Sequence, residues 1–352
     1  MESRHERQIV ERLKQLKPEL NKINKHKTGL TIFENTTMQP VSDVQLSASY
    51  LFIGENKYKV GQMLGKGAFG DVKIGFCLKS NEKVAIKIQN RSTQIEYHAK
   101  TLSSIEKASN YVTRQIGIED DLLKLTGQYI ASTSILSEKG VEKHYSVMKF
   151  IDGVKLKDIF NNLSYQDKLQ CFIDIATQIN FLHDQGYLHL DVWRENLLYS
   201  NGKAMLHDYG CAARLNEMGF FMCKLKGSHI PPEIYESYEK KERCLYREYS
   251  DVFALGMTFH ELLHNDYHDY SADKSFDEFV DRYNEYYLKV LYSKKESQDI
   301  LDKLIGRMIC PNPIIRISIP NTINCLKLSK PISIENVSVE GNANANPSLR
   351  RN

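Results

Sequence analysis

The sequence predicts an α+β protein in which strands dominate the first part of the chain and helices the second. Residues 58–64 and 71–75 alternate apolar and polar side chains on either side of a glycine-rich turn, which indicates a β-hairpin. A helix is predicted over residues 165–185 because apolar residues recur there at helical spacing, at Leu169, Phe172, Ile173, Ala176, Ile179 and Leu182. At 352 residues the chain is long enough to bury a large core.

Composition excludes several classes of protein. Lys and Arg number 47 against 44 acidic residues, a net charge of +3 that argues against a nucleic-acid binder. Seven cysteines without a regular framework indicate reduced thiols. The sequence contains neither a secretory leader nor an apolar run of about 20 residues. We therefore expect a cytoplasmic protein.

Residues 1–55 form an N-terminal extension in this interpretation. Apolar residues at Ile9, Leu13, Leu16, Leu20 and Ile23 predict an amphipathic helix that Pro18 ends or kinks. Residues 1–29 contain eight Lys or Arg and four Glu, so this basic helix is suited to a membrane surface or a partner, or to packing on the protein itself. Residues 30–50 have the composition of a linker.

The glycine-rich turn comprises Gly65, Lys66, Gly67, Ala68, Phe69 and Gly70. Glycines allow the backbone to approach phosphate groups without side chains in the way. The same spacing can open a dinucleotide-binding helix. A strand pattern follows Gly70 instead of a helix, which favours the hairpin interpretation.

Three polar residues form a second constellation. Asp191 and Asn196 lie five residues apart, ahead of an apolar run that predicts a strand, and Asp208 follows twelve residues after Asn196. Asp and Asn are also common in ordinary turns, because they bond their own backbone. An aspartate that orients a hydroxyl, together with an amide and an aspartate that hold a metal ion, is what phosphoryl transfer to a hydroxyl requires.

Together with Val84-Ala85-Ile86-Lys87, these motifs resemble those of eukaryotic-type protein kinases, in family order. The resemblance implies a two-lobed fold over residues 56–325, with a small antiparallel β lobe at 56–150 and a larger helical lobe at 154–325, before a disordered tail at 326–352. It also implies ATP and Mg²⁺ as cofactors and a protein as substrate.

The resemblance assigns roles to individual residues. Lys87 would contact the nucleotide phosphates, Asp191 would orient the acceptor hydroxyl, and Asn196 and Asp208 would bind the metal ion. The adenine would be bordered by Val72, Ala85, Met148, Phe150 and Ile151. The acidic partner of Lys87 is expected to be Glu96, with Glu106 as the alternative.

Four further positions are expected to support this site. By resemblance, Asp251 would hold the backbone of the catalytic loop and Glu233 would pair with Arg316. Ser228 stands near the position of a threonine in Ser/Thr kinases, which favours a Ser/Thr acceptor.

Departures from the family pattern carry information as well. Leu190 replaces the arginine that pairs with a phosphorylated activation loop, so we expect activity without such phosphorylation. Tyr209 replaces a phenylalanine, and Trp193 replaces a lysine whose charge Arg194 would supply.

Three alternatives remain open. A pseudokinase, which binds nucleotide without turnover, is supported by Leu190, Trp193 and the short spacing from Lys87 to Glu96. A small-molecule kinase on the same fold is disfavoured because the segment ending at Glu233 is typical of a peptide-binding one. The His-Glu-Leu-Leu-His sequence at 260–264 matches a zinc metalloprotease motif, with Glu278 or Glu285 as a third ligand.

Overall fold

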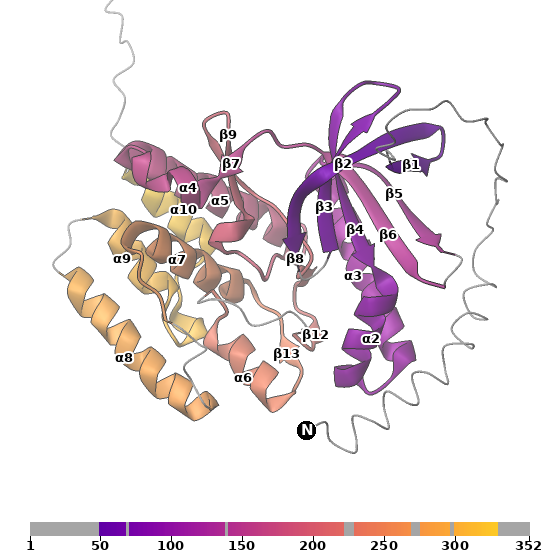
Figure 1. The fold of residues 1–352 in the computed structure, drawn as a ribbon. Helices are drawn as coiled ribbons and strands as arrows, with labels where there is room; N and C mark the ends of the chain where they lie inside the picture. The colour runs from indigo at the N-terminus through magenta and orange to yellow at the C-terminus, as the bar shows by residue number, and fades with distance from the viewer. Residues whose placement is uncertain are drawn as a thin grey trace, which may run out of the picture.

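A computed structural model of the chain describes residues 49–67, 70–137, 140–221, 229–268, 275–295 and 299–329. The fold has two lobes, one built on a β-sheet and one built on helices (Figure 1). The predicted two-lobed α+β class is therefore confirmed. The predicted helix within residues 1–29, the linker after it and the tail from residue 330 onward lie outside the described residues.

The first lobe is built on a six-stranded antiparallel sheet in the order β1-β2-β3-β4-β6-β5. Its strands are β1 (Ser49–Ile53), β2 (Asn56–Gly67), β3 (Gly70–Cys77), β4 (Lys83–Asn90), β5 (Tyr129–Leu136) and β6 (Glu142–Lys149). The sheet begins at Ser49 and not at residue 56, because β1 pairs with β2. Buried side chains of the sheet form a hydrophobic core that includes Tyr58, Ile86 and Val147.

Two helices, α2 (Arg91–Leu102) and α3 (Ile105–Leu125), follow β4. They are separate because Ser103 adopts a left-handed conformation and the Ser104 side chain then caps α3 by accepting the Lys107 backbone N–H. Both apolar faces meet in a cluster that includes Ile95, Ala99 and Val112. The later part of α3 packs on the helical lobe instead, so α3 connects the two lobes.

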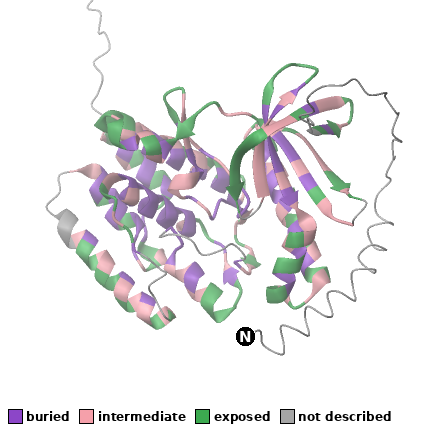
Figure 2. Cartoon of the chain, viewed as in Figure 1, coloured by how far each residue is buried: buried purple, intermediate pink, exposed green. Residues whose placement is uncertain are grey.

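The second lobe is mainly helical. Its helices are α4 (Leu156–Ile159), α5 (Tyr165–Asp184), α6 (Pro232–Lys240), α7 (Glu248–His264), α8 (Phe276–Lys295), α9 (Ile300–Met308) and α10 (Ile319–Leu328). Buried side chains concentrate on α5 and α7, at the centre of the lobe (Figure 2). Because α10 continues to Leu328, the ordered domain extends slightly past the predicted end at residue 325.

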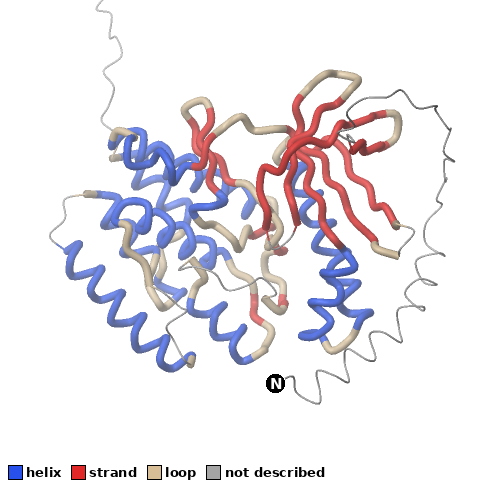
Figure 3. Tube along the Cα trace, viewed as in Figure 1, coloured by secondary structure: helices blue, strands red, loops and turns tan. Residues whose placement is uncertain are grey.

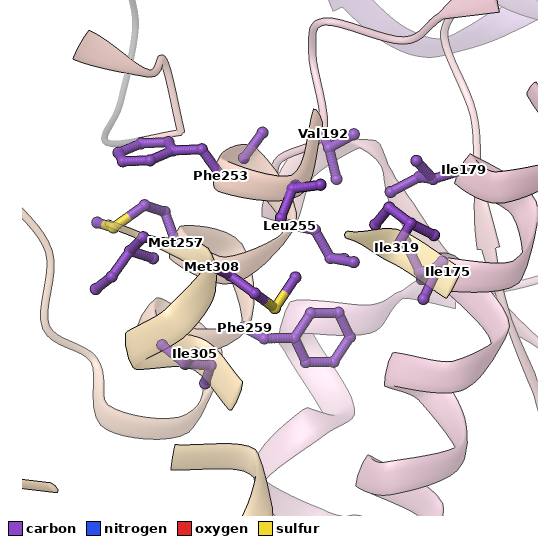
Figure 4. Packing of buried hydrophobic residues seen from close by; sticks show 14 of the residues in the cluster. Ile175, Ile179, Val192, Phe253, Leu255, Met257, Phe259, Ile305, Met308 and Ile319 are labelled. Carbon is purple, nitrogen blue, oxygen red and sulfur yellow. The ribbon is translucent and has the colours of Figure 1, made fainter. Parts of the chain in front are cut away.

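The core of this lobe reaches the loop that carries Asp191. Val192 lies in the same apolar cluster as Leu255 and Phe259 of α7 (Figure 4). Its backbone carbonyl also accepts a hydrogen bond from the Thr258 hydroxyl at 2.8 Å. The residue next to Asp191 is thus anchored by packing and by a buried hydrogen bond.

Short strand pairs bring the loops of the site together. The pairs are formed by β7 (Val154–Lys155), β8 (Tyr187–Leu188), β9 (Leu197–Ser200), β10 (Lys203–Leu206), β11 (Ala213–Arg214), β12 (Met218–Gly219) and β13 (Cys244–Leu245). Strand β9 pairs with β10 and β7, while β8 pairs with β11. The pair of β8 and β11 lies on the side of the helical lobe that faces the sheet (Figure 1 and Figure 3).

Two expectations drawn from composition can be compared with the described residues. None of the helices among them has both the length and the apolar character that a membrane span needs. Five cysteines carry free thiols, namely Cys77, Cys171, Cys244, Cys310 and Cys325. Cys211 is disulfide-bonded, so the expectation of reduced thiols is wrong at this position.

Candidate active site

A cleft of about 560 Å³ lies between the two lobes and contains most of the predicted site residues. This volume falls in the usual range for small-molecule sites. The predicted residues that line it are Gly65, Lys66, Gly67, Gly70, Val72, Ala85, Lys87, Met148, Phe150, Ile151, Asp191, Asn196 and Asp208. The fold therefore brings together residues that are more than a hundred positions apart in sequence.

The hairpin of β2 and β3 forms one wall of the cleft. Gly67 pairs with Gly70 at its tip, and Ala68 and Phe69 between them lie outside the described residues. Gly70 has φ +147°, and a Cβ added there would lie 2.5 Å from the Ile88 backbone oxygen. Only glycine allows β3 to approach β4 this closely at the point where the hairpin faces the cleft.

Lys87 is the centre of a buried charge network. The side chain is only 4% exposed. Its ammonium group donates to Glu119 Oε1 at 2.5 Å and to Asp208 Oδ1 at 2.7 Å. The second oxygen of Glu119 accepts a hydrogen bond from Gln89 Nε2 at 2.9 Å. One cation thus connects β4, helix α3 and the loop that carries Asp208.

The pKa values in this network follow from burial and from mutual attraction. Burial favours the neutral amine of Lys87, but attraction by Asp208 and Glu119 outweighs burial and raises the pKa of Lys87. Burial also disfavours ionised Asp208, yet Lys87 lowers the pKa of that carboxyl to about 2. Burial raises the pKa of Glu119 despite the attraction of Lys87. Asp208 is therefore the stronger acid of the two that share Lys87.

The predicted partner of Lys87 is wrong, because neither Glu96 nor Glu106 reaches the cleft. Glu96 lies on the exposed face of α2, and Glu106 lies exposed in the first turn of α3. The family pattern suggested that the first helix after the lysine strand carries the acid. Here an additional helix comes first, and the acid, Glu119, lies on the second.

A signal for Glu119 was present in the sequence. Ile116, Ile118, Leu122 and Leu123 surround it on the buried side of α3. An acidic residue on the apolar face of an amphipathic helix requires a buried cation as its partner. Lys87, on an otherwise apolar strand, is the matching cation.

The catalytic loop holds Asp191 through Asn196. The Asn196 amide donates to the Asp191 backbone oxygen at 2.9 Å and to Asp191 Oδ2 at 2.8 Å. Asn196 is buried, and its backbone oxygen accepts the His207 N–H at 3.0 Å. The loop with Asp191 and the loop with Asp208 are thereby fixed to each other.

Asp251 anchors the backbone of the catalytic loop, as the resemblance implies. Its carboxylate accepts the backbone N–H groups of His189 at 2.9 Å and Leu190 at 2.8 Å. Leu190 has φ +58°, a left-handed conformation that is costly for leucine. The two charge-assisted bonds therefore hold a strained turn immediately before Asp191.

Tyr209 occupies the position next to Asp208 without disturbing the site. Its side chain is buried among Ile118 and Leu122 of α3 and Leu182 of α5. The aromatic ring therefore points into the core, while the neighbouring Asp208 carboxylate points to Lys87. Replacement of phenylalanine by tyrosine at this position is compatible with a correctly placed Asp208.

Three expectations about supporting residues have different outcomes. Glu233 and Arg316 form the expected bidentate ion pair, with N–O distances of 2.6 and 2.8 Å. Arg194, expected to replace a catalytic-loop lysine, instead pairs with Glu261 at 2.8 Å and does not line the cleft. Ser228 lies outside the described residues, and its neighbour His229 is the residue that contacts Asp191.

The metalloprotease alternative lacks a site in the described part of the chain. Glu261 is paired with Arg194, and His264 Nε2 lies 2.7 Å from Asp302 Oδ1. His260 is buried within α7. Among the described residues no group of three or more His, Cys, Asp or Glu is arranged to hold a metal ion.

The cleft is suited to ATP and a divalent metal ion. Asn196 and Asp208 supply the oxygen ligands that Mg²⁺ prefers. Lys87 supplies a buried positive charge next to them, and the glycine hairpin leaves room for phosphates. Apolar side chains of Val72, Ala85 and Met148 border the remainder of the cleft, as a purine requires.

This arrangement of two lobes, hairpin, buried lysine and paired loops is that of a protein kinase. The sequence pattern of the protein kinase domain matches residues 58–326, so the chain belongs to this family. The chain is 27% identical over 285 residues to CBL-interacting protein kinase 8 of Oryza sativa subsp. japonica, covering 76% of this chain and 56% of that protein. It is 28% identical over 218 residues to serine/threonine-protein kinase Nek3 of Mus musculus, covering 59% of this chain and 38% of that protein.

The similarity is thus confined to part of the relatives. A match of 27% identity over 281 residues to CBL-interacting serine/threonine-protein kinase 8 of Arabidopsis thaliana covers 55% of that protein. The chain spans about half the length of these two CBL-interacting relatives and less of Nek3.

Proposed function

We propose that this protein transfers the γ-phosphoryl group of ATP, with Mg²⁺, to a serine or threonine hydroxyl of a protein substrate. The observation that carries the proposal is the convergence of Lys87, Glu119, Asp208, Asn196 and Asp191 in one cleft. The serine/threonine preference is supported by the names of the relatives.

The proposed mechanism depends on alignment and charge stabilisation. Lys87 orients the phosphates and is itself held by Glu119. Asn196 and Asp208 would hold the metal ion, which would neutralise charge on the phosphates. Asp191 orients the acceptor hydroxyl and accepts its proton as the hydroxyl oxygen bonds to the γ-phosphorus. The bond from that phosphorus to the β,γ-bridging oxygen breaks at the same time, and ADP leaves. Because Asn196 also bonds Asp191, metal ligand and base are placed together.

One of the three arguments for a pseudokinase, the short spacing from Lys87 to Glu96, no longer holds. The short spacing between Lys87 and Glu96 suggested a damaged site, but the partner of Lys87 is Glu119 and the pair is intact. Leu190 is a core residue and Tyr209 leaves Asp208 in place. Trp193 is the remaining departure.

The proposal is tested by incubating purified protein with labelled ATP, Mg²⁺ and a peptide library. We expect the wild type to phosphorylate serine or threonine peptides and Asp208→Ala to lose the signal, because it removes a metal ligand and a partner of Lys87. Equal signals from both proteins would identify a contaminant. ATP binding without transfer would favour the pseudokinase.

We further propose that activity does not depend on phosphorylation of the activation segment, residues 208–233. Leu190 is buried where the family has an arginine that binds phosphate. Unmodified side chains connect α3 to the segment instead: Arg114 pairs with Glu217, and Gln115 Nε2 donates to the backbone oxygens of Gly210 and Ala212 at 3.0 and 2.8 Å. These contacts hold α3, and with it Glu119, without a phosphate.

Phosphatase-treated protein is therefore expected to keep its kcat. In the same assay, Glu217→Gln should lower kcat by no more than about fivefold, because an exposed ion pair of α3 contributes at most about 1 kcal/mol. Loss of activity on phosphatase treatment, with unchanged thermal stability, would contradict the proposal.

The roles of residues 1–29 and the location of the protein stay predictions. A basic helix there would contact anionic membranes or a partner, which co-sedimentation of the full chain with anionic vesicles would test. A cytoplasmic location is tested by cell fractionation.

A further inference from the structure

The catalytic loop lacks the cation that the family places two residues after the catalytic aspartate. Trp193 occupies this position, and an indole cannot carry the charge. Arg194 is engaged by Glu261 at 2.8 Å, and its Nε lies 3.8 Å from Glu195. Neither side chain is available to support Asp191.

His229, at the end of the activation segment, takes a place beside Asp191. Its Nε2 lies 3.1 Å from Asp191 Oδ1, while Asn196 Nδ2 lies 2.8 Å from Oδ2 of the same carboxylate. His229 is 4% exposed and lines the cleft. Each oxygen of Asp191 is therefore held by one side chain, from two different loops.

Trp193 fixes the orientation of this imidazole. The two rings are stacked, with centroids 5.3 Å apart and an interplanar angle of 26°. An ionised carboxylate only accepts hydrogen bonds, so the nitrogen facing Asp191 must carry a proton. The residue that replaces the family's lysine thus acts as a support for a histidine donor.

We propose that His229 is a positioning residue for phosphoryl transfer, which holds the Asp191 carboxylate toward the acceptor hydroxyl. The inference rests on the proposed function. It assigns to His229, stacked on Trp193, the task of holding the Asp191 carboxylate. The charged group that His229 contacts is the Asp191 carboxylate.

The test compares two variants that separate the two properties of the histidine. His229→Gln keeps an N–H donor at similar reach but loses the aromatic ring, whereas His229→Phe keeps the stacked ring but loses the donor. If the hydrogen bond positions Asp191, kcat should fall by about 10²-fold in His229→Phe and much less in His229→Gln, with KM for ATP within about twofold. If the ring serves only for packing, the order of the two variants reverses.

Fluorescence supplies a measurement that does not require turnover. Trp193 is the only tryptophan of the chain, so its emission reports on the stacked imidazole. Emission should rise in His229→Phe, because an imidazole next to the indole quenches its emission by accepting an electron from the excited ring, and a phenyl ring does not. Unchanged emission would overturn the contact on which the inference depends.

The outcomes separate this inference from the proposed function. An active wild type with full kcat in His229→Phe would refute the positioning role and leave the kinase activity standing. If the wild type folds and binds MgATP but transfers no phosphate, the proposed activity is refuted. The positioning role is then refuted with it, even where the variants differ from the wild type in fluorescence. Equal loss of kcat in both variants, with lowered thermal midpoints, would show a structural role only.

Discussion

Replacement of Glu119 by alanine is expected to reduce kcat/KM about 10²-fold or more and to destabilise the protein by about 3–5 kcal/mol. Glu119 is buried and bonds both Lys87 and Gln89. Its removal leaves Lys87 with Asp208 as its partner in the network, so the ammonium group would shift toward Asp208 and away from the nucleotide phosphates. Steady-state kinetics and chemical unfolding measure the two effects.

The chain offers matched controls for this experiment. Glu96→Ala and Glu106→Ala remove exposed glutamates from α2 and α3 of the same lobe. Both should change the free energy of unfolding by less than about 0.5 kcal/mol and leave kcat/KM near that of the wild type. A large loss of activity in Glu96→Ala with a mild effect in Glu119→Ala would mean that the assigned ion pair is wrong.

Asp251→Ala should have a comparable effect through the backbone of the catalytic loop. The carboxylate is completely buried and accepts hydrogen bonds from the His189 and Leu190 N–H groups, with His183 Nε2 at 2.9 Å. Each orphaned buried donor costs about 1–3 kcal/mol, so we expect the three together to cost roughly 3–9 kcal/mol in the free energy of unfolding. Release of the left-handed turn at Leu190 should also lower kcat in whatever protein remains folded.

Asp184→Ala is the control for Asp251→Ala. Asp184 is exposed at the end of α5 and accepts one hydrogen bond, from Asn180 at 2.9 Å. Its removal should shift the thermal midpoint by little. If Asp251→Ala unfolds at the same temperature as Asp184→Ala, then Asp251 does not stabilise the catalytic loop.

Several elements of the fold were predictable from local sequence patterns. The β-hairpin around Gly65–Gly70, the lysine strand and the long helix α5 all occur where periodicity indicated them. Such elements are readable because strands and helices repeat their buried positions at fixed spacings. The boundary between α2 and α3 was missed, since it depends on one left-handed residue, Ser103, and one serine cap.

The candidate site was predictable where its residues belong to short motifs. Lys87, Asp191, Asn196 and Asp208 line the cleft as expected. Glu119 and His229 were not predicted, because no short motif assigns either of them a role. Their roles depend on which side chain of a long helix or loop reaches the cleft.

The amino-acid sequence alone determined the family, the β-hairpin, the lysine strand and the long helix α5, and which motif residues line the cleft, because these depend on local spacing and side-chain type. Tertiary structure alone decided that Glu119 pairs with Lys87, that Arg194 is bound to Glu261, and that His229 stands beside Asp191. Charges separated by tens of residues find partners only through the packing of helices and loops, which no local pattern specifies.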